Sequence, residues 1–268
     1  FQDDTNGDLK YAAWNGSAWE ILTVDSDGSV GADTSLALDR TGQPRISYRD
    51  VANNDLKYAA WNGAAWELQT VDSDGSVGFD NSLKLDSNDR PRISYRDTTN
   101  GDLKYAAWSG RAWDIETVDR SGSVGYDTSL ALDRDNRPHI SFRDIGNADL
   151  KYAAWNGVFW EIETVDAEGS VGSYTSLALA PDGSPRISYR DTTKGDLKFA
   201  FGPAKDCAVF NNPPVAENQS ATIVGALPAR LQLMGRDLDG DVLSFQTNNL
   251  PPHGRLTEFD SATGSFTY

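Results

Sequence analysis

The chain has 268 residues, of which 38% are apolar, and its 40 acidic and 24 basic residues give a formal net charge of −16. A surface this acidic repels phosphate backbones, which excludes nucleic acid as an expected partner, but it leaves cations and neutral sugars open. We also expect no membrane insertion, because no run of 18 apolar residues occurs. A single cysteine, Cys207, cannot form an internal disulfide.

The heptapeptide DLKYAAW begins at Asp8 and returns at Asp55, Asp102 and Asp149, and a divergent copy, DLKFAFG, begins at Asp196. The copies are all 47 residues apart. A fixed period of this size indicates a repeat architecture, in which each unit buries its apolar faces against its neighbours.

Four short strands are predicted in each repeat, at 9–14, 18–24, 35–39 and 44–49 in the first copy. Each shows alternation of apolar and polar residues or enrichment in β-branched and aromatic ones. The turn Asn15-Gly16 between the first two strands is a strong hairpin signal, because both residues tolerate positive φ. No segment has the period of a helix, so the repeat is expected to be a four-stranded antiparallel meander.

An array of such units indicates an all-β fold, a β-propeller of four-stranded antiparallel blades at residues 1–203, whereas a β-solenoid is the alternative. The small and aliphatic third strand suits the crowded axis, which places whole blades at 35–71, 82–118 and 129–165. Residues 9–24 then begin the chain as two outer strands, and 207–210 are a candidate outermost strand at its end. Residues 9–24 either complete the last blade of a four-bladed ring or follow missing upstream blades. We expect missing blades, since Phe1 aligns with mid-strand Tyr48.

All eight tryptophans lie in the repeats, as pairs that flank the predicted hairpin turn. The pairs are Trp14 and Trp19, Trp61 and Trp66, Trp108 and Trp113, and Trp155 and Trp160. Aromatic faces stack on sugar rings, and a ring of equivalent pockets gives avidity, so these residues are the candidate ligand-binding set. Packing against the neighbouring blade is the competing interpretation, and large aromatic residues favour it whatever the function.

Charged residues recur around one loop of every blade. They are the Arg-Asp pair, Arg49-Asp50 in the first copy, and the Asp and Lys of the Asp-Leu-Lys that follows it. A charge-assisted network between strands explains them better than a catalytic carboxylate pair, because an enzyme needs one differentiated site. His139 stands where the other copies have arginine, and as a solitary histidine it is interpreted as substitution drift. We therefore predict no catalytic residues and expect that the chain is not an enzyme.

The loop that enters the third strand of each repeat keeps Gly-Ser-Val-Gly, which indicates a tight turn and close packing. Its first two copies also resemble a calcium loop, but the third copy has Ser121 in place of the second acid and the fourth has Glu168, so a metal is the minority interpretation there. The variable positions on the same rim are where a ligand surface would be tuned. They are Ala32, Phe79, Tyr126 and Ser173.

Residues 204–214 are predicted to be a proline-rich linker, and 215–268 a second domain. Through NNPPVAENQS, GRDLDGDVLSF, PPHGRL and GSFTY the latter resembles bacterial immunoglobulin-like or cadherin-like β-sandwich domains, and we expect a C-terminally truncated copy. The resemblance implies a possible calcium site at Glu217, Asp237, Asp239 and Asp241, and carboxylates at alternate positions suit that ion. A solvated Asp-Gly turn is the alternative. No other cofactor is expected.

The propeller repeats are similar to SLALD…PRISYRD…DLKYAAW repeats of large exported bacterial proteins. This resemblance implies an extracellular or cell-surface module for binding or adhesion, in which a propeller head on an immunoglobulin-like stalk recognises a glycan or a surface protein. A polysaccharide-active propeller enzyme, similar to a sialidase or a lyase, is one alternative. A purely structural spacer is the other.

Overall fold

The structure is a computed structural model that describes residues 1–203, 215–216, 228–236, 243–246 and 255–268. The chain divides into two compact units, Phe1–Cys207 and Ala208–Tyr268. The predicted division at 203 and 214 stays a prediction. Among the described residues no helix is long and apolar enough to cross a membrane.

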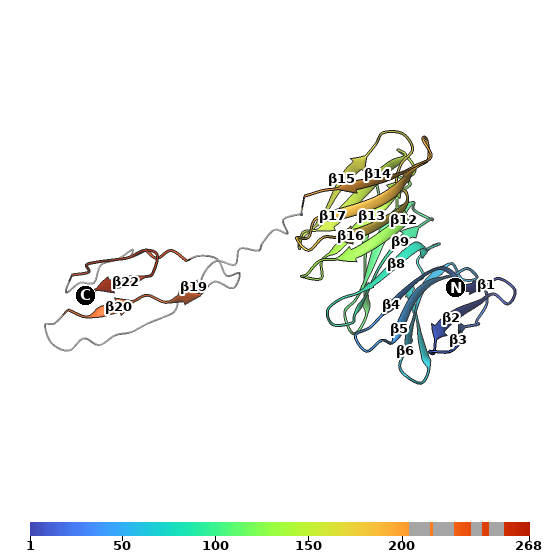
Figure 1. Ribbon diagram of the computed structural model, residues 1–268, viewed down its shortest axis with the longest axis horizontal. Helices are drawn as coiled ribbons and strands as arrows, with labels where there is room; N and C mark the ends of the chain where they lie inside the picture. Colours follow the sequence, from blue (N-terminus) through green and yellow to red (C-terminus); the bar gives the residue numbers. More distant parts are fainter. Residues whose placement is uncertain (204–214, 217–227, 237–242, 247–254) are drawn as a thin grey trace. The chain divides into compact units, whose positions relative to one another are not determined.

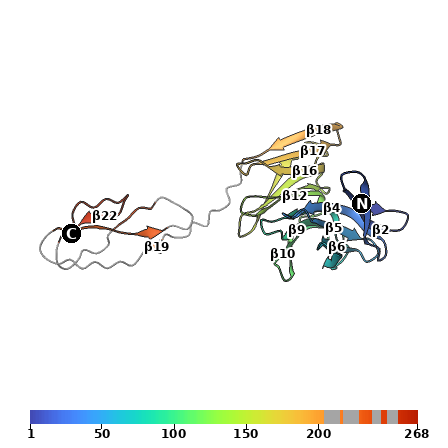
Figure 2. The ribbon, with the colours of Figure 1, turned by 60° about the horizontal axis from the view of Figure 1, so that its bottom comes forward.

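The first unit consists of five antiparallel sheets, which we number as blades 1 to 5 in chain order (Figures 1 and 2). Blade 1 contains β1 (Gln2–Asp3), β2 (Asp8–Trp14) and β3 (Trp19–Asp25). Blade 2 contains β4 (Val30–Leu38), β5 (Pro44–Asp50), β6 (Asp55–Trp61) and β7 (Trp66–Asp72). Blade 3 contains β8 (Phe79–Leu85), β9 (Pro91–Asp97), β10 (Asp102–Trp108) and β11 (Trp113–Asp119). Blade 4 contains β12 (Tyr126–Leu132), β13 (Pro138–Asp144), β14 (Asp149–Trp155) and β15 (Trp160–Asp166), and blade 5 contains β16 (Ser173–Leu179), β17 (Pro185–Asp191) and β18 (Asp196–Phe201).

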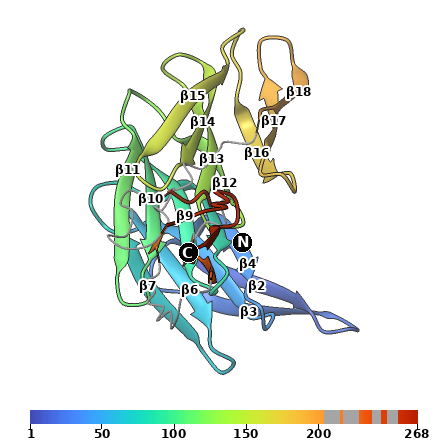
Figure 3. The ribbon, with the colours of Figure 1, turned by 90° about the vertical axis from the view of Figure 1, so that its left-hand side faces the viewer.

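The innermost strands of successive blades are neighbours: β4 contacts β8, β8 contacts β12, and β12 contacts β16. Figure 3 shows the sheets following one another around these strands. The expected all-β propeller of four-stranded antiparallel blades is therefore confirmed. Strands β2 and β3 pair with β1 in a sheet of their own and do not complete the last blade, so the four-bladed closure is not what the structure shows.

Neighbouring blades fit together where the leucine of Asp-Leu-Lys meets a glycine of the next blade. A Cβ on Gly78, which has φ +88°, would lie 3.1 Å from the Cα of Leu56, so only glycine allows this approach. The conserved spacing of Gly-Ser-Val-Gly thus has the predicted close-packing role. Leu56 is fully buried, whereas its counterpart Leu197 on β18 is 83% exposed because no described blade covers it.

A buried carboxylate joins each blade to the next at the end of its last strand. Asp72 lies at the end of blade 2. It accepts hydrogen bonds from two residues of blade 3, Tyr95 Oη at 2.6 Å and Lys104 Nζ at 2.5 Å. Burial raises the pKa of Asp72, but these two donors outweigh it and hold the pKa below its usual value. The predicted charge network is therefore real, and it connects adjacent blades as well as strands of one blade, where Lys57 Nζ lies 3.8 Å from Asp50 Oδ2.

In the described residues of the second unit, taken by itself, there are two short two-stranded sheets. Strand β19 (Val215–Ala216) pairs with β21 (Gly235–Arg236), and β20 (Arg230–Gln232) pairs with β22 (Ser265–Thr267). The immunoglobulin-like or cadherin-like domain stays a prediction, and the candidate strand at 207–210 lies outside the described residues.

Candidate functional site

The tryptophan pairs are cross-strand neighbours that close the hairpin between the last two strands of blades 1 to 4. Trp61 is opposite Trp66, with ring centroids 5.4 Å apart, and the other three pairs have centroids 5.3 to 5.8 Å apart. The turn is held by Asn62, whose Oδ1 accepts the backbone N–H of Ala65 at 2.9 Å. Gly63 takes positive φ there, as the Asn-Gly signal predicts.

In blades 2 to 4 the second tryptophan of the pair packs against the preceding blade. Trp113 lies edge-on to Tyr58 with centroids 5.6 Å apart, and its Nε1 donates to Gln69 Oε1 at 3.0 Å. Trp160 makes the same contacts with Tyr105 and with Glu116 Oε2 at 3.1 Å. These contacts are the ones that the packing interpretation predicts, and the ligand-binding role of the tryptophans stays a prediction.

The first tryptophan of the pair borders a cleft between blades, and the same cleft occurs twice. The first cleft, between blades 2 and 3, and the second cleft, between blades 3 and 4, each hold about 300 Å³. The first cleft is lined by Arg45, Tyr58, Ala60, Glu67, Gln69, Asn88, Asp89, Arg90, Pro91, Trp108 and Gly110. The second is lined by Arg92, Tyr105, Glu116, Asp135, Asn136, Arg137, Pro138, Trp155 and Trp160. Every residue of the second cleft except Trp160 stands 47 residues after a residue that lines the first cleft.

Each cleft combines an aromatic wall with fixed polar groups. Arg45 donates to Asp39 Oδ2 at 2.7 Å and to the carbonyl of Trp61 at 2.8 Å, so its guanidinium is held in place. Burial raises the pKa of Tyr58 to about 12, which keeps its hydroxyl protonated at neutral pH. The arrangement offers an indole face for a ring and several donors and acceptors for hydroxyl groups.

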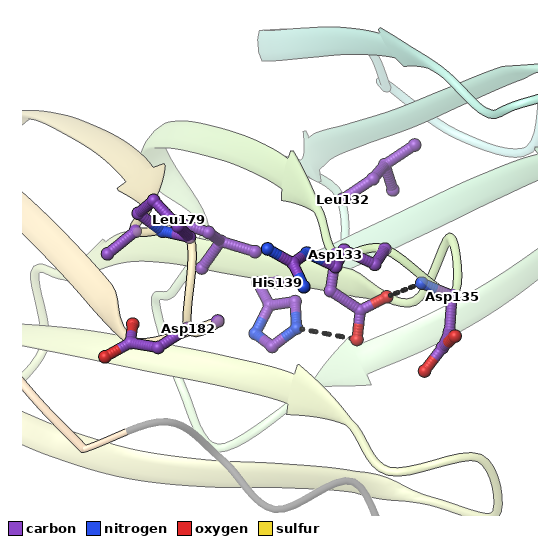
Figure 4. Close-up of a pocket in the computed structure, with 10 residues that line it drawn as sticks. Leu132, Asp133, Asp135, His139, Leu179 and Asp182 are labelled. Atoms are coloured by element: carbon purple, nitrogen blue, oxygen red, sulfur yellow. Dashed lines mark hydrogen bonds and ion pairs between the residues drawn. The ribbon is translucent and has the colours of Figure 1, made fainter.

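Blades 4 and 5 enclose a different space, the His139 cavity, which holds about 420 Å³ (Figure 4). It is lined by Leu132, Asp133, Arg134, Asp135, His139, Leu179, Ala180, Pro181, Asp182 and Gly183. His139 is almost fully buried; its Nδ1 lies 2.5 Å from Tyr152 Oη. Its Nε2 lies 3.6 Å from Asp133 Oδ2 and has no hydrogen-bond partner among the described residues. His139, predicted to be mere drift, therefore lines a cavity between blades 4 and 5, and only the break in the repeat could have indicated it.

Three aspartates, Asp33, Asp80 and Asp127, line a third hollow of about 350 Å³ beside the inner strands. Burial, followed by the charges of Asp127 and Asp33, raises the pKa of Asp80 to about 6. Sequence reasoning missed this group, although an aspartate at the same place in three repeats was its signal. Among the residues that the structure describes, no group of acids, histidines and cysteines is placed to hold a metal ion.

Two of the variable rim positions, Phe79 and Tyr126, make contacts between blades, and the ligand surface expected there stays a prediction. The Phe79 ring lies 3.7 Å from the guanidinium carbon of Arg49, and Tyr126 lies 3.5 Å from that of Arg96. These aromatic residues cover arginines of the preceding blade in cation–π contacts. Their variation therefore follows packing at the blade boundary.

The candidate calcium ligands cannot be placed by the structure. Glu217, Asp237, Asp239 and Asp241 all lie outside the described residues. The calcium site stays a prediction from the resemblance.

No family model and no curated protein matches the chain, but solved structures share its fold. A triple arginine-to-alanine mutant of AofleA from Arthrobotrys oligospora has a TM-score of 0.53 at 12% identity, over 74% of this chain and 63% of that one. An ulvan lyase described as a new polysaccharide lyase family has a TM-score of 0.52 at 15% identity, over 72% and 57%. A Dyadobacter fermentans protein of unknown function has a TM-score of 0.51 at 11% identity, over 75% and 70%. The chain thus spans less than two thirds of the first two proteins, and identities this low show the fold alone.

The expectation that the chain is not an enzyme is contradicted by this comparison. A polysaccharide lyase shares the fold, so a propeller of this kind is no argument against catalysis. The premise of equal blades also fails, because His139 replaces the arginine of the other copies and lines the cavity between blades 4 and 5. The comparison supports a propeller architecture for this chain, which the polysaccharide lyase shares.

Proposed function

We propose that the propeller unit binds glycans in the first and second clefts. The observation that carries this proposal is the repetition of one cleft, with the same lining positions, at two successive blade boundaries. Core packing alone gives no reason to keep the same half-open, polar-lined space beside Trp108 and Trp155. A repeated binding site does give such a reason.

The chemistry of each cleft suits a sugar ring. An indole face contacts the C–H groups of the ring, while fixed side chains such as Arg92 and Asn136 exchange hydrogen bonds with its hydroxyl groups. A site of this size takes one or two sugar units, and each site alone binds weakly. Two rigidly spaced sites on one chain raise the avidity for a repeated or branched glycan by effective concentration.

The same proposal covers the protein to which the chain belongs and the role of its C-terminal residues. The chain is part of an exported bacterial protein whose propeller meets glycans, free or on a surface protein. The residues from 215 onward form an immunoglobulin-like or cadherin-like stalk with calcium at Glu217, Asp237, Asp239 and Asp241. The resemblance of the C-terminal motifs supports this arrangement.

A glycan array with the whole chain tests the proposal. We expect a defined set of ligands, and the Trp155→Ala variant should lose signal for them while its circular dichroism spectrum and melting transition stay native. Trp14→Ala is the matched control, because Trp14 is exposed on blade 1 and borders neither cleft. An array without specific binding, or an equal effect of both variants, would overturn the proposal.

A further inference from the structure

The turns after the innermost strands of neighbouring blades are clamped to each other. In blades 2 and 3, Arg40 donates from its backbone N at 3.1 Å and from its Nε at 2.8 Å to the two carboxylate oxygens of Asp89. In blades 3 and 4 the equivalent residues, Ser87 and Asn136, bond to each other twice, at 2.7 and 3.0 Å. Each clamp closes the space between two turns.

Between blades 4 and 5 this clamp is missing. Arg134 stands at the position of Arg40, but the position of Asp89 is taken by Gly183, which has no side chain. Among the described residues Arg134 has no hydrogen-bond or ion-pair partner, and both residues line the His139 cavity. The cavity therefore lies where the carboxylate of a clamp would have been.

The other charged groups of the cavity have partners of their own. Asp133 Oδ1 accepts backbone N–H groups from Asp135 and Arg137, each at 2.8 Å, and its Oδ2 faces His139. Asp182 accepts from the Ser184 hydroxyl at 2.5 Å. Arg134 is thus the charge left for a ligand.

Two acids of the blade 3 turn near Arg40 have no counterpart in the blade 5 turn, although Asp182 stands there at the position of Asn88. The two acids are Asp86 and Asp89, and the corresponding residues of blade 5 are Ala180 and Gly183. Leu132 and Leu179 add apolar surface to the lining. A small ligand with one apolar face and one carboxylate matches this set of groups.

We infer that the His139 cavity binds a carboxylate-bearing sugar of the uronic acid class, whose carboxylate takes the place of the missing Asp89 carboxylate beside Arg134. A guanidinium binds a carboxylate through charge-assisted hydrogen bonds, and the Arg40–Asp89 pair shows that this turn presents arginine for such a bond. Sugar hydroxyls reach the acidic side chains, and the ring covers the leucines. The site shares only Asp135 with the second cleft, and the inference does not depend on glycan binding in the clefts.

Isothermal titration calorimetry with glucuronate, and with glucose as the neutral control, tests the inference on the whole chain. We expect glucuronate to bind at least about tenfold more tightly than glucose, and Arg134→Gln to remove that preference. Arg40→Gln changes the equivalent arginine at another boundary and should leave glucuronate binding unchanged. Equal binding of the two sugars, or full binding by Arg134→Gln, would overturn the inference.

A second pair of variants restores the clamp. Gly183 has φ +81°, and a Cβ there meets nothing within 4 Å, while Asp89 and Asn136 occupy the same turn position at φ 59° and 63°. Gly183→Asp should therefore fold, supply its own carboxylate to Arg134, and weaken glucuronate binding about tenfold or more. Gly42→Asp is the matched control, because Gly42 is the equivalent open position in blade 2. Undiminished glucuronate binding by Gly183→Asp would overturn the inference, and so would an equal loss in Gly42→Asp.

Discussion

Lys104 Nζ lies 2.5 Å from Asp72 Oδ2, although the two residues belong to different blades. Both side chains are almost buried, and Tyr95 Oη donates to the same oxygen at 2.6 Å. The same relationship recurs between Asp25 and Lys57 and between Asp119 and Lys151. Like the leucine–glycine contacts, these ion pairs hold neighbouring blades together.

Lys104→Met should destabilise the propeller unit by about 3 kcal/mol or more, because it leaves the Asp72 carboxylate buried without its cation. The measurement is the urea midpoint and slope of the unfolding transition. Lys194→Met is the control, since Lys194 and Glu168 form an exposed pair that contributes about 1 kcal/mol at most. Equal effects of the two variants would show that the buried pair has no special role.

Acid should destabilise the propeller unit below about pH 4. Burial raises the pKa values of Asp25, Asp72, Asp119 and Asp166, but hydrogen bonds and lysine charges outweigh it and leave each below the ordinary 3.8. The folded chain therefore takes up these protons at lower pH than the unfolded chain, so the stabilisation is present above pH 3.8 and is lost as the pH falls further. Unfolding free energies measured from pH 5 to pH 2 should fall steadily, and a flat profile would contradict the assignment.

Asp80→Asn should stabilise the chain at pH 7 but not at pH 4. The pKa of Asp80 is raised to about 6, chiefly by burial, so the folded chain binds a proton between pH 3.8 and 6 that the unfolded chain releases. Its contribution to stability therefore falls as the pH rises through that window, and asparagine removes this loss. We expect a gain of about 1 kcal/mol at pH 7, after allowance for solvent screening. A gain of the same size at pH 4 would assign the effect to packing.

Gly78→Ala should be much more destabilising than Gly63→Ala. Both glycines have positive φ, which costs alanine about 1 to 2 kcal/mol, but only at Gly78 does the new Cβ meet another blade, 3.1 Å from the Leu56 Cα. We expect the difference between the two variants to be about 1 to 3 kcal/mol, the usual cost of overpacking. Thermal unfolding of the two variants measures it, and equal midpoints would contradict the close-packing role of Gly-Ser-Val-Gly.

Calcium removal should lower the melting temperature of the C-terminal unit and leave that of the propeller unit unchanged. An ion bound only by the folded state stabilises that state by mass action. Differential scanning calorimetry with calcium and with a chelator is the measurement. The Asp237→Asn, Asp239→Asn variant should melt equally in both buffers. An unchanged transition of the unaltered chain would refute the proposed site at Glu217, Asp237, Asp239 and Asp241.

The sequence predicted the propeller well, because the 47-residue period appears directly as the repeated text that begins at Asp8. It predicted the hairpins for the same reason, since Asn-Gly turns are local. It did not predict which tryptophan of a pair is covered, because Trp113 is covered by Tyr58 of another blade and only the order of blades in space determines that. The His139 cavity was missed because it depends on what Gly183 lacks, and a missing side chain leaves no pattern.

The number of equivalent sites is the most direct test of glycan binding in the clefts. Isothermal titration calorimetry with a small glycan from the array should give two equivalent sites per chain, one in each cleft. Trp108→Ala and Trp155→Ala should each reduce that number to one with native melting behaviour, and the double variant should not bind. A single site, or two sites that persist in the double variant, would contradict the account.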